Sequence, residues 1–317
     1  MITGGAGFIG AHLAQRLVAE GAVVRIVDNL ERGSEENLGS ARDSIDLRVA
    51  DLCTPGVAEE ACQGVDVVFH FASKVGGITY YLAKPYEVLA ANIAMDGAVL
   101  DAVLAAGVPR YLYASSAHVY PGELQTTPDA ALIHENQAIP ASPELSYGWA
   151  KLIGEQAVEF AITEGWPLRA SVPRIIGAYG PRQDVDLATG SAIPVFSRRA
   201  IEYPERTPYR VLGTGRETRS YCYIDDIVEG LLRSIGAMDN HALVGPFNLG
   251  TEDRIAIGDL VDTVTPWHRQ GRGFWSSARP VNDPCNGIGW LFFTVGGMLM
   301  NADRRRVDHL DIAVISL

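Results

Sequence analysis

The pattern Tyr147-Gly148-Trp149-Ala150-Lys151 is the strongest chemical signal in this sequence. A tyrosine and a lysine four residues apart lie on the same face of a helix. A free tyrosine has a pKa of about 10, but a neighbouring ammonium group favours the phenolate. Tyr147 could therefore take a proton from a substrate hydroxyl as a hydride leaves the same carbon, while Lys151 holds the ribose of a dinucleotide. A surface pair on an ordinary helix would have the same spacing, so other residues must support this interpretation.

Support comes from hydroxyl-bearing residues about thirty positions earlier in the chain. Ser115 and Ser116 follow an expected strand at Tyr111–Ala114, and His118 comes shortly after them. In a parallel sheet the carboxyl ends of the strands line one crevice, and the helix that carries Tyr147 begins at that edge. We therefore expect Ser116 to share the proton of the substrate hydroxyl with Tyr147.

A glycine-rich segment at the start of the chain predicts a dinucleotide site. Gly4, Gly7 and Gly10 form a G-x-x-G-x-x-G pattern that leads into an expected helix. Glycines permit a tight turn and let backbone amides approach a pyrophosphate, and the helix N-terminus adds partial positive charge there. The pattern alone is weak, because glycine-rich turns are common.

The end of the next expected strand favours NAD over NADP as the cofactor. Val23–Val27 is followed by Asp28, about 20 residues after the glycine loop. A carboxylate at this place can accept hydrogen bonds from a ribose 2′-hydroxyl, and it repels a 2′-phosphate. Two alternatives stay open, because Arg32 could serve NADP and an aspartate before Asn29 could simply form a turn.

Two later strand ends are expected to complete the cofactor site. Asp51 and Leu52 follow an expected strand, and this carboxylate would lie near an adenine edge unless it only ends the strand. Phe71 and Ala72 follow another expected strand, where small residues let the cofactor lie close. His70, just before them, could equally be a buried histidine with satisfied hydrogen bonds.

The elements that must position these residues alternate between short β-branched runs and helical stretches. Such alternation implies parallel strands with crossover helices, which is an α/β fold of the Rossmann type with a doubly wound parallel sheet. Strands are expected at residues 22–27, 46–50, 65–71, 110–114 and 168–176, and helices at residues 11–20, 90–106 and 148–164.

The sequence also predicts two domains. Residues 1–177 form the expected NAD-binding domain, with segments near 214–235 woven back into it, and residues 178–317 mainly form a smaller substrate-binding lobe. Only two residues precede the glycine loop, so the first strand, which should be the central one, is expected to be short. From about Pro266 the pattern is irregular, which predicts a poorly packed segment and marginal stability.

Composition argues against several classes of protein. The formal net charge is -12, whereas a general nucleic-acid binder needs a basic face to meet phosphates. The four cysteines lack metal-ligand spacing and fit reduced thiols in a cytoplasmic protein. No signal-peptide pattern is present, and the most apolar late stretch, around Ile288–Met300, is too short to span a bilayer. We expect no metal, no nucleic-acid partner and no membrane association.

Together these motifs resemble the extended short-chain dehydrogenase/reductase family of nucleotide-sugar epimerases and dehydratases. The resemblance extends from residue 1 to about residue 263, and it implies NAD as the cofactor and a nucleotide-diphosphate sugar as the substrate. In such enzymes the catalytic serine stands two positions before a variable acid/base residue, which assigns these roles to Ser116 and His118. Residues 213–226 resemble a later motif, in which an arginine, here Arg219, faces the diphosphate. The matching motifs are Thr3-Gly4-Gly5-Ala6-Gly7-Phe8-Ile9-Gly10, Asp28-Asn29-Leu30, Asp51-Leu52, Ser115-Ser116-Ala117 and Tyr147 with Lys151.

Some segments resemble particular members of this family. Lys74, Gly76 and Gly77 are similar to a segment of GDP-fucose synthases, and the glycine pair is also similar to GDP-mannose 3,5-epimerases. This implies that these three residues contact the substrate. The segment Ser115–Pro121 is similar to the same epimerases, although they carry a cysteine where this chain has His118. The resemblance therefore implies a homodimeric epimerase that oxidises C4 of a sugar transiently, with a GDP-sugar favoured over a UDP-sugar.

Two departures from that pattern leave other activities open. The 3,5-epimerases place a second acid/base, lysine or histidine, near Ser191–Ala192, and this chain has neither there. An asparagine that often precedes the Tyr-Gly-Pro motif is replaced by Gly177. The 4,6-dehydratases carry an Asp-Glu pair at Ala117–His118, which is absent here. The alternatives are a UDP-sugar 4-epimerase and a nucleotide-sugar-binding pseudoenzyme with weakened catalysis.

Overall fold

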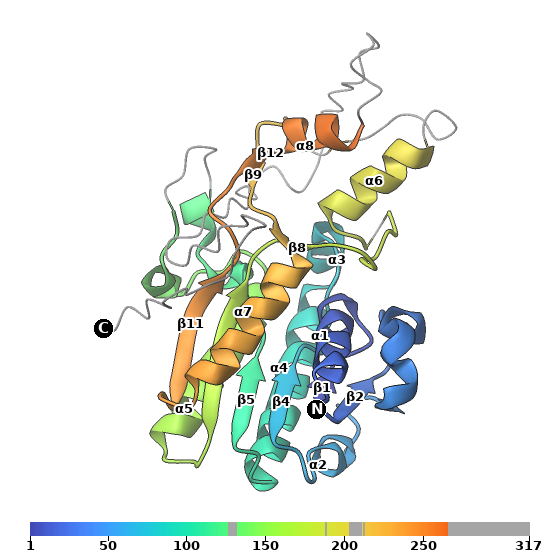
Figure 1. The fold of residues 1–317 in the computed structure, drawn as a ribbon. Helices are drawn as coiled ribbons and strands as arrows, with labels where there is room; N and C mark the ends of the chain where they lie inside the picture. The colour runs from blue at the N-terminus through green and yellow to red at the C-terminus, as the bar shows by residue number, and fades with distance from the viewer. Residues whose placement is uncertain (126–131, 188, 203–210, 212, 266–317) are drawn as a thin grey trace.

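A computed structural model describes residues 1–125, 132–187, 189–202, 211 and 213–265 of the 317-residue chain. Its main element is a parallel sheet with the strand order β11-β7-β5-β4-β1-β2-β3 (Figure 1). From β1 the chain winds first towards β3 and then in the opposite direction towards β11, so the sheet is doubly wound, as predicted. The strands are β1 (Ile2–Thr3), β2 (Val24–Asp28), β3 (Ile45–Val49), β4 (Val67–His70), β5 (Arg110–Tyr113), β7 (Arg169–Ile175) and β11 (Leu243–Leu249), and β6 (Ser115–Ser116) pairs with β7.

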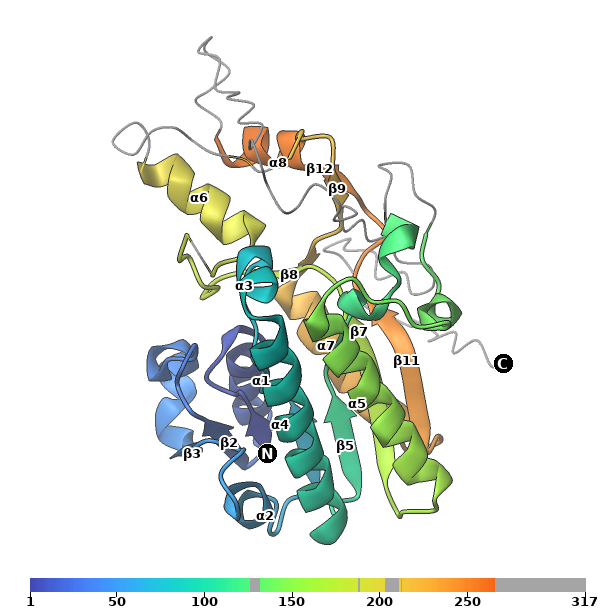
Figure 2. The same ribbon diagram turned by 180° about the vertical axis from the view of Figure 1, so that it is seen from behind.

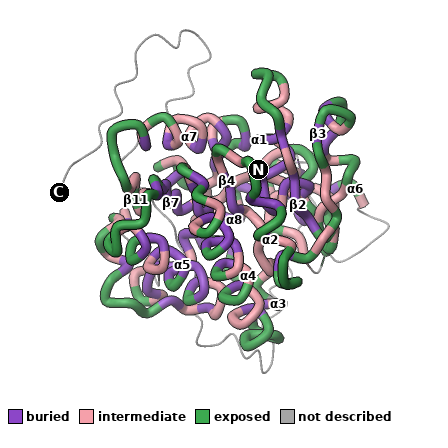
Figure 3. The backbone as a smooth tube through the Cα atoms, turned by 90° about the horizontal axis from the view of Figure 1, so that it is seen from below, coloured by how far each residue is buried: buried purple, intermediate pink, exposed green. Residues whose placement is uncertain are grey.

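Helices cover both faces of this sheet. On one face, α1 (Phe8–Ala19) and α7 (Ile224–Ala237) pack against the strands in one apolar cluster (Figure 1). On the other face lie α4 (Pro85–Ala105) and α5 (Ser146–Thr163), with the short α2 (Val57–Ala61) beside α4 (Figure 2). Buried residues concentrate in the strands and on the helix turns that face them (Figure 3).

The central strand is short, as the sequence predicted. β1 has two residues, and it lies between β2 and β4. Ile2 is in register with Ile26 on one side and with Phe69 on the other, and its side chain is fully buried. The glycine loop begins directly after Thr3, so the loop starts at the carboxyl edge of the sheet.

Residues beyond β7 contribute both to the sheet and to a smaller part above its carboxyl edge. β11 extends the sheet next to β7, and sequence reasoning did not identify this strand. Beyond the strand ends, α6 (Ala192–Glu202) packs against α8 (Ile257–Val264) around a small apolar cluster (Figure 1). The segment from Pro266, which was expected to pack poorly, lies outside the described residues, and the domain boundaries stay a prediction. Short pairs join β8 (Ala178–Tyr179) to β10 (Cys222–Tyr223) and β9 (Thr218–Arg219) to β12 (Ile255–Ala256).

Short helical segments connect the main elements near the same edge. They are η1 (Glu35–Ser44), α3 (Ile78–Ala83), η2 (Ala117–Val119), η3 (Gly122–Gln125) and η4 (Glu135–Ala138).

The helix α4 is unusually apolar. Among the described residues it is the one helix that has the length and composition to cross a membrane. It packs against α2 and α5, however, and seven of its residues are buried in the protein. Core helices of folded domains have the same properties.

Candidate active site

The glycine loop has the geometry of a dinucleotide cradle. Gly4 has a φ of 64°, and a Cβ at this residue would lie 2.7 Å from the backbone nitrogen of Ala72. A Cβ at Gly10 would lie 2.5 Å from the carbonyl oxygen of Gly4. Gly7 precedes α1, and no side chain caps this end of the helix, so its first amides can face a pyrophosphate. The loop therefore fits NAD.

Asp28 lies at the end of β2 beside this loop, as predicted. Its carboxylate accepts one hydrogen bond from the backbone nitrogen of Ala6 and one from that of Leu30, each at 2.9 Å. A carboxylate has about four lone-pair sites, so it can also accept bonds from ribose hydroxyls. Arg32, which could have served NADP, instead forms an ion pair with Asp184 at 2.8 Å.

The side chains of the other predicted cofactor residues have local contacts. Asn29 accepts a hydrogen bond from the backbone nitrogen of Glu31 at 3.0 Å, and Asp51 accepts one from that of Cys53 at 2.8 Å. Both are turn-forming interactions, so a role for these two side chains in binding the cofactor stays a prediction. The apolar clusters beside the loop hold the side chains of Phe8, Ile9, Leu52, Phe71 and Ala72.

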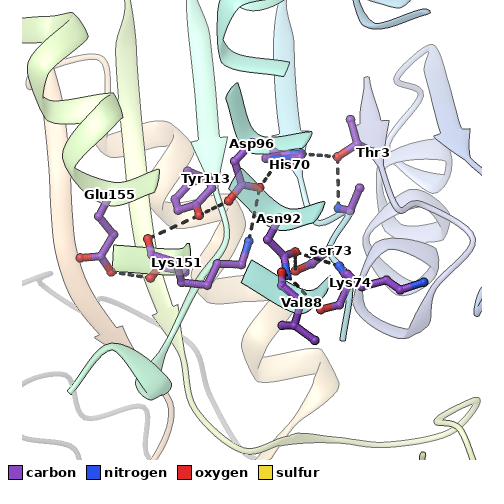
Figure 4. Close-up of polar contacts among 12 residues, drawn as sticks. Thr3, His70, Ser73, Lys74, Val88, Asn92, Asp96, Tyr113, Lys151 and Glu155 are labelled. Carbon is purple, nitrogen blue, oxygen red and sulfur yellow. Dashed lines mark hydrogen bonds and ion pairs between the residues drawn. The ribbon is translucent and has the colours of Figure 1, made fainter. Parts of the chain in front are cut away.

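Lys151 is buried at the centre of the site. Its side chain is 1% exposed, and Nζ lies 3.8 Å from Oδ1 of Asp96 and 4.6 Å from the centre of the Tyr113 ring (Figure 4). Nζ has no hydrogen-bond partner among the described residues. Burial lowers the pKa of Lys151, and the charge of Asp96 acts in the opposite direction. A buried ammonium that has a nearby carboxylate but no hydrogen-bond partner among the described residues supports the predicted contact with a cofactor ribose.

Ser116, His118 and Tyr147 come together, as the motifs predicted. Ser116 ends β6 and caps η2, and its Oγ lies 2.9 Å from Nδ1 of His118. The ring of His118 lies edge-on to that of Tyr147, with 5.4 Å between the centroids. On its other side Tyr147 stacks on Tyr81 of α3, with 5.3 Å between the centroids. Lys151 follows one turn later on the same helix, α5.

Burial controls the pKa values of both rings. It raises the pKa of Tyr147 above its ordinary value, an effect that a hydrogen bond with Ser73 reduces and the charge of Asp96 increases. Burial also lowers the pKa of His118 to about 4, and the charge of Arg219 contributes. His118 is therefore neutral at pH 7, whereas Tyr147 keeps its proton. The nearby ammonium of Lys151 is therefore not enough by itself to convert Tyr147 to its phenolate.

Two glycines on α5 allow the close packing of the site. A Cβ at Gly148 would lie 2.0 Å from the carbonyl oxygen of His118, and a Cβ at Gly154 would lie 2.1 Å from Oη of Tyr113. The helix can therefore lie directly against η2 at one end and against β5 farther along. Because Gly148 follows Tyr147, its missing side chain is what brings the tyrosine to His118.

A buried ion pair supports the strand that carries Ser116. Arg174 of β7 donates to Glu155 of α5 through Nε at 2.9 Å and through Nη2 at 2.7 Å. The hydroxyl of Ser115 also donates to Glu155, and Arg174 donates to Oη of Tyr120 at 3.0 Å. The two charged side chains are 4% and 0% exposed. This network joins β6, β7 and α5 directly behind the catalytic candidates.

The predicted substrate segment at residues 74–77 lies between β4 and α3. Asn92 holds its backbone, since it accepts from the Lys74 amide at 2.8 Å and donates to the Lys74 carbonyl at 3.0 Å. The ammonium of Lys74 forms an ion pair with Glu31. Gly76 and Gly77 directly precede α3, and this helix contains Tyr81, whose ring stacks on that of Tyr147. Contact of this segment with a substrate stays a prediction.

Arg219 lies on β9 and is partly buried near the same rings. Its charge lowers the pKa of His118, and it acts in the same direction on the pKa of Glu144, which burial raises. Both carboxylate oxygens of Glu144 are buried and have no hydrogen-bond partner among the described residues. Glu144 lies three residues before Tyr147 but belongs to no motif, so sequence reasoning did not single it out.

The two departures from the epimerase pattern have local explanations. Gly177 has a φ of 55°, and a Cβ there would lie 2.0 Å from the carbonyl oxygen of Ser220, so this turn requires glycine. Ser191 directly precedes α6, and its hydroxyl accepts a hydrogen bond from Gln183 at 3.2 Å. No lysine or histidine stands at residues 191–192 to act as a second acid/base.

Asp96 is the main residue of the site that sequence reasoning missed. Asn92 and Asp96 are four residues apart in the otherwise apolar helix α4, and both are buried. Two polar residues at this spacing on an apolar helix were the signal in the sequence that could have pointed to Asp96. In the part of the chain that the structure describes, no group of three or more His, Cys, Asp or Glu side chains could hold a metal.

Comparison with known sequences agrees with this geometry. GDP-mannose 3,5-epimerase 1 of Oryza sativa subsp. japonica is 31% identical over 265 residues, which cover 83% of this chain and 67% of the rice protein. UDP-glucuronic acid decarboxylase 2 of Arabidopsis thaliana is 30% identical over 266 residues, which cover 83% of this chain and 56% of that protein. The chain is therefore similar to enzymes of both GDP-sugars and UDP-sugars.

Comparison with solved structures gives the same fold. A UDP-galactose 4-epimerase superposes with a TM-score of 0.71 at 27% identity, over 93% of this chain and 88% of that one. A dTDP-glucose 4,6-dehydratase from Streptomyces venezuelae, solved with NAD bound, superposes with a TM-score of 0.76 at 21% identity, over 93% of this chain and 87% of that one. The model of the NAD dependent epimerase/dehydratase family matches residues 1–250. The chain belongs to this family and is an NAD-dependent enzyme of nucleotide-sugars.

Proposed function

We propose that this protein is an epimerase that oxidises C4 of a nucleotide-diphosphate sugar transiently, with a GDP-sugar of the GDP-mannose type as substrate. The observation that best supports the proposal is that Ser116, His118 and Tyr147 lie close together beside the buried Lys151. A hydroxyl, an imidazole and a phenol at one place can handle both a hydroxyl proton and a proton on a neighbouring carbon. The similarity to GDP-mannose 3,5-epimerases supports the GDP-sugar.

Each residue then has a distinct role in the first half of the reaction. Tyr147 takes the proton of the C4 hydroxyl, and Ser116 binds that hydroxyl and shares the proton. Lys151 binds the ribose and stabilises the phenolate of Tyr147. NAD, which the glycine loop and Lys151 would hold, would supply the hydride acceptor for C4, and its cationic ring would favour that phenolate.

His118 acts in the second half, on the carbon beside the C4 ketone. If Nδ1–H donates to Oγ of Ser116, Nε2 presents its lone pair as a base. The ketone acidifies the neighbouring C–H group, so that a neutral imidazole can remove its proton. Return of a proton to the other face of that carbon inverts it, and return of the hydride to C4 completes the reaction.

The absence of lysine and histidine from residues 191–192 favours one alternative, which is a UDP-sugar 4-epimerase. Without a second acid/base at that place, the chain would invert only C4, and His118 would hold a substrate hydroxyl. The similarity to a UDP-sugar enzyme, at 30% identity against 31% for the rice GDP-mannose 3,5-epimerase, supports this alternative.

One experiment separates these activities. The purified enzyme is incubated with GDP-mannose, UDP-glucose or UDP-galactose in deuterated water, and the recovered sugars are analysed by mass spectrometry and NMR. We expect turnover of GDP-mannose with deuterium at C3 or C5. Inversion of a UDP-sugar at C4 without deuterium would establish the 4-epimerase instead. Binding of these nucleotide-sugars without any turnover would indicate a pseudoenzyme.

We also propose that two copies of the chain associate through the outer surfaces of α4 and α5. These helices lie side by side (Figure 2) and expose several large apolar side chains. Burial of this apolar area in a second copy would stabilise the pair. Light scattering should give the mass of a dimer, and replacement of Ile153 and Phe160 by lysine should give a monomer. The exposed apolar side chains are Tyr86, Ile93, Trp149, Ile153 and Phe160.

A further inference from the structure

Asp96 is a buried carboxylate that connects the catalytic lysine to the cofactor loop. It lies on α4 and is 6% exposed. Oδ1 accepts a hydrogen bond from Nε2 of His70 at 2.9 Å, and Oδ2 accepts one from Oη of Tyr113 at 2.6 Å. Nζ of Lys151 approaches Oδ1 to 3.8 Å (Figure 4). The three groups therefore reach one carboxylate from β4, β5 and α5.

The hydrogen bonds around His70 have one consistent direction. The backbone nitrogen of Ala72 donates to Oγ1 of Thr3 at 3.2 Å, so the Thr3 hydroxyl proton is available for Nδ1 of His70, at 2.6 Å. Nε2–H of His70 then donates to Asp96. Complete burial lowers the pKa of His70, which agrees with a neutral ring. Since His70 is neutral, Lys151 is the cation that this carboxylate faces.

We propose that Asp96 is the counter-ion of Lys151, which keeps the ammonium charged and in place, and that it sets the pH range in which the site works. Asp96 is a positioning residue in this role, since it acts on the substrate and the cofactor only through Lys151 and Tyr147. The inference rests on the proposed function of those two residues, but not on the identity of the sugar.

The charges around Asp96 and Lys151 determine whether loss of the Asp96 charge raises or lowers the pKa values of its neighbours. Burial alone would raise the pKa of Asp96, but the charge of Lys151 and the hydrogen bonds from His70 and Tyr113 outweigh burial and lower it. The carboxylate is therefore negative when the enzyme works. Its charge opposes the loss of a proton from Lys151 and from Tyr147, so removal of that charge lowers the pKa of both. The polar and titratable groups that face Asp96, Lys151 or Tyr147 are His70 of β4, Tyr111 and Tyr113 of β5, Glu155 of α5, Tyr81 of α3, His118 of η2, Cys53 and Ser73.

The chain offers a direct test, because it contains only three lysines, Lys74, Lys84 and Lys151. Selective isotope labelling of lysine gives three side-chain NMR signals, and the signal of the buried Lys151 can be titrated without cofactor or substrate. We expect Asp96→Asn to lower the pKa of Lys151 by about one to three units. Asp101→Asn removes the same charge from an exposed position of α4 and should leave this pKa unchanged.

The pH profile of turnover gives an independent measurement. With NAD bound, whose cationic ring would favour the phenolate, activity rises as Tyr147 loses its proton and falls as Lys151 loses its own, so Asp96→Asn should shift both limbs to lower pH. Asp96→Glu keeps the charge and should restore the position of the profile, even if turnover is reduced. Asp96→Ser provides a smaller neutral variant if the asparagine variant does not fold.

Two outcomes would contradict different parts of this argument. An unchanged pKa of Lys151 in a folded neutral variant, or reduced turnover with no shift of the profile, would mean that Asp96 has only a structural role. A shifted pKa of Lys151 together with normal turnover of Lys151→Met would instead overturn the proposed function of the lysine.

Discussion

The carbonyl oxygen of His118 lies 2.0 Å from the place where a side chain at Gly148 would begin. This contact fixes the separation of η2 and α5, which hold His118 and Tyr147. The candidate acid/base residues His118 and Tyr147 are thus brought together by a backbone contact. Their position depends on a residue that does no chemistry.

Gly148→Ala should therefore separate the candidate catalytic groups. The new methyl group must displace either η2 or the first turn of α5, and a displacement of about 1 Å at an active site can cost about 100-fold in rate. Turnover of the variant should fall by that order, as measured with the substrate identified by the product assay.

Gly97→Ala is the matched control for this variant. Gly97 lies inside α4, and a Cβ there meets nothing within 4 Å. Alanine should stabilise this helix by about 0.5–1 kcal/mol and leave turnover unchanged. Equal turnover of the two variants would show that the contact between Gly148 and His118 does not position the site.

Tyr147→Phe should remove the acid/base without moving its neighbours. The ring can still stack on Tyr81 and meet His118, so binding of the nucleotide-sugar should stay nearly intact. Turnover should fall about 10²–10⁴-fold, as for the loss of a general acid/base. Tyr80→Phe, in which the lost hydroxyl contacts Glu87, serves as the control, and near-normal turnover of Tyr147→Phe would rule out the assignment.

Much of this arrangement could be predicted from local patterns. The helical spacing of Tyr147 and Lys151 and the glycine loop were confirmed in position, since both depend on rules that act within a few residues. Boundaries were less accurate. The helix expected from Ala90 begins at Pro85, because proline is favoured in the first turn of a helix.

Long-range contacts could not be predicted in this way. Asp96 has no motif, and its importance appears only when α4 packs beside β4 and β5. The same holds for Arg174 of β7 and Glu155 of α5, which form an ion pair between strand and helix although they are 19 residues apart. β11 also escaped prediction, since Gly245 and Pro246 interrupt its strand pattern.

The cofactor preference depends on Asp28. Asp28→Ala removes the carboxylate that would accept the ribose hydroxyls and repel a 2′-phosphate. It should weaken the binding of NAD and reduce discrimination against NADP, as measured by fluorescence titration of both. Arg32 is engaged with Asp184, so Arg32→Ala should not change this preference. Tighter binding of NADP than of NAD by the unmodified protein would contradict the assignment.

Glu155→Gln should destabilise the protein strongly. Its carboxylate accepts two bonds from Arg174 and one from Ser115, and its side chain is fully buried. The neutral amide leaves the guanidinium of Arg174 as an uncompensated buried charge, which costs about 3–5 kcal/mol. Denaturant unfolding measures this loss.

Glu159→Gln is the control, because Glu159 lies one turn later on α5 and is exposed. Its substitution should change the free energy of unfolding by less than about 0.5 kcal/mol. Equal effects of the two substitutions would show that the buried ion pair does not support the fold.

The role of His118 can be tested through the pH dependence of solvent exchange. Burial, together with the charge of Arg219, lowers its pKa from 6.5 to about 4. The neutral imidazole is the form that removes a carbon-bound proton, and a lowered pKa extends this form to lower pH. Incorporation of deuterium into the sugar should therefore persist well below pH 6.5, wherever the C4 ketone still forms.

Comparison of two histidine variants completes this test. His118→Ala should abolish deuterium incorporation at C3 or C5. Hydride transfer at C4, which is measured through the absorbance of the reduced cofactor, should continue because Ser116 and Tyr147 are retained. His241→Ala, which changes an exposed histidine far along the chain, should alter neither signal. Exchange that disappears below about pH 6.5 would indicate an ordinary solvated histidine. Exchange that survives in His118→Ala would assign the role of base to another group. Glu144, whose buried carboxylate oxygens have no hydrogen-bond partner among the described residues, would be the next residue to replace.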